Sequence, residues 1–72
     1  MPMVIAHFML EEDLLETREV TREWLQEACA NCENVLLSDG NTYEIVEVRY
    51  SQEGPRTHAR VAIVAPRFAR GG

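Results

Sequence analysis

Two turn signals, one in the middle of the chain and one near its end, place the tightest limit on what this sequence can fold into. Asp39-Gly40 and Gly54-Pro55 each lie between runs that favour extended structure, and Asp-Gly readily supplies the positive φ that a tight hairpin needs. Residues 42–50 are rich in β-branched and aromatic side chains, which is typical of a strand. The second half therefore predicts a three-strand meander, with strands over 34–37, 42–50 and 58–65.

The first half begins with a short apolar run over residues 3–10, whose length favours a buried strand. Residues 13–30 have two interpretations. In the preferred one, a long helix starts at Asp13, which acts as N-cap with Glu16 three positions later. In the alternative, residues 14–20 form a second strand and Thr21 caps a shorter helix. Both interpretations place a helix over residues 22–30.

These elements predict an α+β domain in which one helix packs on a small, mainly antiparallel sheet. The preferred order is β-α-β-β-β. The alternative order is ββαββ, a hairpin followed by a helix and further strands, which is the element order of a β-grasp. We expect a single domain over residues 1–66 and a flexible tail over residues 67–72.

Composition excludes several classes of protein. A 46% hydrophobic chain is too apolar for intrinsic disorder, and its longest uncharged apolar run is far short of the roughly 20 residues that cross a bilayer. We find no signal-peptide pattern and expect a cytoplasmic protein. A core of this size supplies on the order of 3–5 kcal/mol, so we expect a homo-oligomer to add stability.

Cys29 and Cys32 form the one recognisable short motif, C-x-x-C. They fall at the predicted C-terminal end of the helix, where the helix dipole destabilises the thiolate that redox chemistry needs. A zinc site needs four ligands, and only His7 and His58 could complete it. We therefore expect the cysteines to pack in the core. We predict no metal, no cofactor and no catalytic residue, and hence no enzyme.

Charge is unevenly distributed in a chain whose net charge is -5. Residues 1–39 hold nine acidic and two basic side chains. Five of the acids recur at helical spacing: Glu12, Glu16, Glu19, Glu23 and Glu27. On a long helix they would form one acidic stripe, which would bind a basic partner, mimic nucleic-acid phosphates or simply face water. The overall acidity argues against direct nucleic-acid binding.

The last residues, Arg70-Gly71-Gly72, follow the final predicted strand. A Gly-Gly sequence in this position resembles the ubiquitin-like family, including the sulfur carriers. The resemblance covers about six residues and is consistent with the β-grasp order. It implies that an activating enzyme adenylates the carboxyl group of Gly72. The other interpretation is a tail without a function.

We therefore expect a small, non-catalytic interaction or adaptor module that binds a protein partner or a second copy of itself. We expect no binding to membranes. The alternative function is a ubiquitin-like or sulfur-carrier protein activated at Gly71 and Gly72. A third is an acidic inhibitor that mimics nucleic acid.

Overall fold

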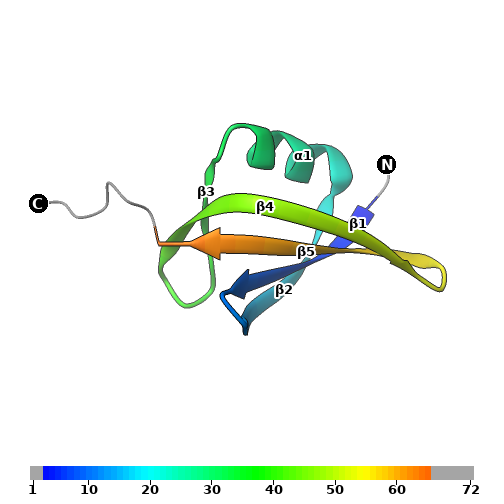
Figure 1. Cartoon of the computed structure of the whole chain (residues 1–72), viewed down its shortest axis with the longest axis horizontal. Coiled ribbons are helices and arrows are strands. Elements are labelled where there is room, and N and C mark those ends of the chain that lie inside the picture. The colour runs from blue at the N-terminus through cyan, green and yellow to red at the C-terminus, as the bar shows by residue number, and fades with distance from the viewer. Residues whose placement is uncertain (1–2, 66–72) are drawn as a thin grey trace, which may run out of the picture.

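A computed structural model describes residues 3–65, which form one helix and five strands. In chain order these are β1 (Met3–Leu10), β2 (Asp13–Thr21), α1 (Arg22–Ala30), β3 (Asn34–Leu36), β4 (Thr42–Glu53) and β5 (Arg56–Val64). The strands form one curled sheet in the order β2-β1-β5-β4-β3, and α1 lies across one face (Figure 1). β1 and β5 are parallel, and the other neighbours are antiparallel. The α+β class is confirmed.

The preferred element order is wrong, because residues 13–21 form β2 and not the start of a long helix. β2 folds back on β1 through a turn in which Glu11 has a φ of 57°. Valine and threonine near its end favour extended backbone, and pairing with β1 satisfies the peptide groups of both strands. The observed order, β-β-α-β-β-β, is a hairpin, a helix and three strands, which is one strand more than ββαββ.

The helix begins at Arg22 because Thr21 caps it. The Thr21 hydroxyl accepts a hydrogen bond from the Trp24 N–H at 3.1 Å, which satisfies one of the free donors of the first turn. At the other end, Cys32 takes the left-handed conformation with a φ of 51°. α1 has nine residues, and no helix within residues 3–65 is long and apolar enough to cross a membrane.

The predicted meander is confirmed, with longer second and third strands. Gly40 and Gly54 have φ angles of 86° and 62° in the two turns. Asp39 fixes the first turn, where it accepts hydrogen bonds from the Asn41 N–H at 2.9 Å and the Tyr43 hydroxyl at 2.7 Å. The bond from Tyr43, followed by that from the Asn41 N–H, lowers the pKa of Asp39, and the Tyr43–Asp39 bond raises the pKa of Tyr43. Local turn chemistry thus sets the register of the β3–β4 hairpin.

The core lies between α1 and the central strands. Alternate residues of β1 and β5 point toward the helix, as period-2 side-chain geometry requires. A bulge at Val46 lets Ile45 and Val48 both face inward, which explains the broken alternation in the sequence of β4. The largest fully buried side chains are Phe8, Leu25, Ile45, Ile63, Val4 and Val61.

Tyr50 offers a test of this packing. Its ring lies under Arg22, whose guanidinium carbon is 4.7 Å from the ring centroid, and its buried hydroxyl has no hydrogen-bond partner within residues 3–65. We predict that Tyr50→Phe raises the free energy of unfolding by about 1 kcal/mol, because it removes an unsatisfied buried group. Urea denaturation measures the change.

Tyr43→Phe is the matched control, since it removes a hydroxyl that donates to Asp39, and it should lower the stability. Equal destabilisation by the two substitutions would contradict the assignment of an unpaired Tyr50 hydroxyl.

Candidate functional site

The sheet has a second face that α1 does not cover. Side chains that alternate with the buried residues of β1 and β5 point to this side. We call it the open face. Its members on β1 and β5 are Met3, Ile5, His7, Met9, His58, Arg60, Ala62 and Val64. β2 and β4 extend this face on either side of them.

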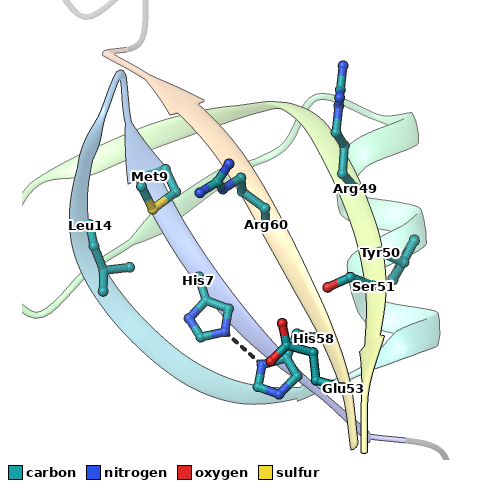
Figure 2. Close-up of a pocket in the computed structure, with 9 residues that line it drawn as sticks. All are labelled: His7, Met9, Leu14, Arg49, Tyr50, Ser51, Glu53, His58 and Arg60. Carbon is teal, nitrogen blue, oxygen red and sulfur yellow. Dashed lines mark hydrogen bonds between the residues drawn. The ribbon is translucent and has the colours of Figure 1, made fainter.

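A shallow hollow of about 580 Å³ lies on the open face (Figure 2). Its lining combines apolar side chains from β1 and β2 with basic and imidazole side chains from β1, β4 and β5. It also includes the carboxylate of Glu53 at the end of β4. The residues that matter below are His7, Met9, Leu14, Arg49, His58 and Arg60. Because several strands contribute, the strand register fixes how these groups are arranged.

His7 and His58 meet inside the hollow, with 2.9 Å between His7 Nε2 and His58 Nδ1 (Figure 2). Their ring planes differ by 7° and their centroids are 5.2 Å apart. This separation is about the N···N distance plus the two ring radii, so the rings meet edge to edge. His7 Nδ1 lies 3.3 Å from the Thr17 hydroxyl. The bond requires one protonated and one unprotonated nitrogen.

The sequence suggested these histidines together only as conceivable zinc ligands with the two cysteines, because they lie on separate predicted strands. The parallel β1–β5 register places Ile5 opposite His58, which makes His7 its diagonal neighbour. Ser51 lies opposite His58 on β4, yet no hydrogen bond joins the two side chains in the structure of residues 3–65. The only other side-chain hydrogen bond of the pair within residues 3–65 joins His7 to the Thr17 hydroxyl.

The C-x-x-C motif lies elsewhere. Cys29 is partly buried against the core under α1, whereas Cys32 is exposed, and both are free thiols. The expectation of core packing thus holds for Cys29 alone. The sheet separates the cysteines from the open-face histidines. Within residues 3–65 no cluster of three or more His, Cys, Asp or Glu side chains could hold a metal.

The five predicted partner-binding acids do not form one stripe, because the long helix does not exist. Glu12 is in the β1–β2 turn, and Glu16 and Glu19 point to opposite faces of β2. Glu23 and Glu27 are on α1. This removes the geometric basis for mimicry of nucleic acid by a single acidic row. Whether any of these acids binds a partner stays a prediction.

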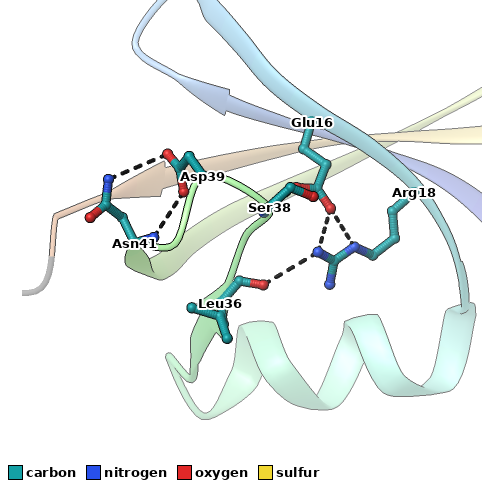
Figure 3. A network of polar contacts seen from close by, with 6 residues as sticks. All are labelled: Glu16, Arg18, Leu36, Ser38, Asp39 and Asn41. Atoms are coloured by element: carbon teal, nitrogen blue, oxygen red, sulfur yellow. Dashed lines mark hydrogen bonds and ion pairs between the residues drawn. The ribbon is translucent and has the colours of Figure 1, made fainter.

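Glu16 has an internal role that sequence reasoning missed. Its carboxylate accepts hydrogen bonds from the Ser38 N–H at 2.7 Å and from Arg18 Nε at 2.7 Å (Figure 3). Arg18 also donates to the Leu36 carbonyl at 3.3 Å. β2 and β3 are opposite edges of the sheet, so this network ties the two edges of the curled sheet together.

The hydrogen bond from Ser38, together with Arg18, holds the pKa of Glu16 below its ordinary value. A lowered pKa means that the folded state favours the ionised carboxylate. Its stabilisation is complete above the unfolded pKa of about 4.3 and is lost as the pH falls through the lower folded value. We predict that Glu16→Gln lowers the melting temperature at pH 7 and weakens the acid dependence of stability below pH of about 4.3.

The control is Glu12→Gln, because Glu12 makes no hydrogen bond or ion pair in the described residues. Thermal unfolding between acid and neutral pH should show no change for the control. An unchanged melting temperature for Glu16→Gln would contradict the edge-to-edge tie.

Two sequence-predicted residues, Gly71 and Gly72, lie outside the described residues 3–65. Comparison of the chain with family models, with curated proteins and with solved structures found no match.

Proposed function

We propose that this chain is a protein-binding module and that the open face is its docking surface. One observation carries the proposal: the helix covers one face of the sheet (Figure 1), while the other face presents a hollow where apolar and basic side chains lie side by side (Figure 2). Such a combination suits recognition, because apolar contact supplies affinity and a few placed polar groups supply specificity.

Exposed apolar side chains strengthen this proposal. Leu14, which is 55% exposed, lies opposite Met9 of β1, and both side chains line the hollow. Neighbouring apolar side chains on one surface mark interaction sites more often than scattered ones do. The partner is a protein, with a second copy of the chain as one case.

Peptide selection against the immobilised full chain tests this proposal. We predict that enriched peptides bind the wild type but lose most of their affinity for Leu14→Glu, which places a charge in the hollow. Leu36→Glu is the matched control, since Leu36 is 62% exposed and lies on β3, outside the hollow. Fluorescence anisotropy with the selected peptides gives the affinities.

Equal binding to both variants, or no enrichment at all, would overturn the proposal. Sedimentation velocity over a concentration series decides whether the partner includes a second copy. A strict monomer at high concentration leaves a different protein as the partner.

A second candidate function, the ubiquitin-like or sulfur-carrier protein, is favoured by one specific feature, the strand at residues 14–20. A long helix over these residues would have argued against the ubiquitin-like candidate. β5 also lies beside β1 and precedes the segment that carries Gly71 and Gly72. In this candidate, the carboxyl group of Gly72, free or freed by cleavage, attacks the α-phosphorus of ATP, and pyrophosphate leaves as the acyl-adenylate forms.

Intact-mass spectrometry after incubation with ATP and a ubiquitin-like activating enzyme tests this second candidate. The expected result is an adenylate, or a downstream conjugate, on the wild type and none on a variant that lacks Gly71-Gly72. An unmodified wild type, together with unchanged function in the shortened variant, would exclude it.

A further inference from the structure

A row of side chains crosses the open face at the centre of the hollow. The register places Thr17 opposite His7, His7 opposite Arg60, and Arg60 opposite Arg49. The row thus runs from β2 through β1 and β5 to β4. It contains two guanidinium groups and an imidazole but no carboxylate.

Arg60 is the unusual member of this row. Like charges directly opposite each other on neighbouring strands destabilise a sheet, and here Arg60 faces Arg49. Arg49 is neutralised by Glu47, with Nε and Oε2 2.8 Å apart. Arg60 makes no hydrogen bond or ion pair within residues 3–65, although the chain has 12 acidic and 7 basic side chains. Although acids are abundant in the chain, neither residue directly opposite Arg60 is one: His7 lies there on β1 and Arg49 on β4.

The surroundings of Arg60 limit what can neutralise it. Figure 2 shows its side chain lying across the hollow, with Met9 and Leu14 on one side. The bond between His7 and His58 keeps their rings edge to edge beneath it. A guanidinium binds a carboxylate through two parallel hydrogen bonds, and the neighbouring apolar surface would bind an apolar side chain.

The acids at the rim distinguish between kinds of anion. Glu53 lines the hollow on β4, Glu47 lies diagonal to Arg60 on the same face, and the protein is acidic overall. A polyanion such as a nucleic acid would be repelled by this rim, since its affinity depends on many phosphate contacts. A single carboxylate on Arg60 meets less of that repulsion than a row of phosphates does.

We propose that the hollow binds an acidic segment of a partner protein, with an Asp or Glu carboxylate on Arg60 and an adjacent apolar side chain on Met9 and Leu14. This inference rests on the proposed function, because it assigns the chemistry of the partner to the same docking surface.

The test uses the full chain and a fluorescent decapeptide in which one Asp is flanked by leucines in a Ser-Gly background. Fluorescence anisotropy should show saturable binding that weakens with salt. Arg60→Gln should reduce the affinity on the order of tenfold, and an Asn in place of the peptide Asp should cost as much. Arg56→Gln is the matched control, because Arg56 is an exposed arginine on the same strand outside the hollow.

The other outcomes distinguish failure of the carboxylate inference from failure of the proposed function. No binding, or equal binding by Arg60→Gln and the wild type, overturns the carboxylate inference. If Leu14→Glu still abolishes binding of the selected peptides, the proposed docking surface survives that failure. If neither Arg60→Gln nor Leu14→Glu changes peptide binding, both the carboxylate inference and the docking surface are contradicted. Stronger binding of an oligothymidylate than of the Asp peptide, with the same dependence on Arg60, would replace the acidic segment by a nucleic acid. Circular dichroism should show that both arginine variants remain folded.

Discussion

The parallel pairing of β1 with β5 is the contact on which the rest of the structure depends. It joins the first strand of the chain to the last and places Ala6 beside Ala59 and Phe8 beside Val61 in the core under α1. The same register, one residue out of phase, brings His7 beside Arg60 on the open face. Because side chains alternate along a strand, one backbone pairing builds both the hydrophobic core and the hollow.

In a five-stranded sheet with so small a core, the edge strands β2 and β3 need stabilising contacts. α1 covers the inner face near the centre, and the Glu16–Arg18 network links β2 to Leu36 of β3 and to Ser38 just after it. Charge therefore serves the fold here, since a carboxylate that satisfies a backbone N–H replaces the pairing that the two edge strands lack. The acidity of the amino-terminal half is partly structural and not only a solvated surface.

Local signals in the sequence predicted the elements that local chemistry determines. The Asp39-Gly40 and Gly54-Pro55 turns define the meander, and both interpretations placed the helix over residues 22–30. Residues 13–21 were misassigned, because Asp13 and Glu16 mimic a capping box while the real cap is Thr21. The His7–His58 pair could not be read from spacing, because its proximity comes from a parallel pairing between strands 51 residues apart.

The open face gives this small domain a surface whose residues the core does not use. Its chemistry depends on the β1–β5 register, and the imidazole pair reports that register directly. Nitrogen-15 NMR of the histidine rings should detect a coupling across the hydrogen bond between His7 Nε2 and His58 Nδ1. The same sample should show contacts between β1 and β5 at Ala6 and Ala59. Two independent imidazole signals without such coupling, and no contact between those strands, would contradict the account.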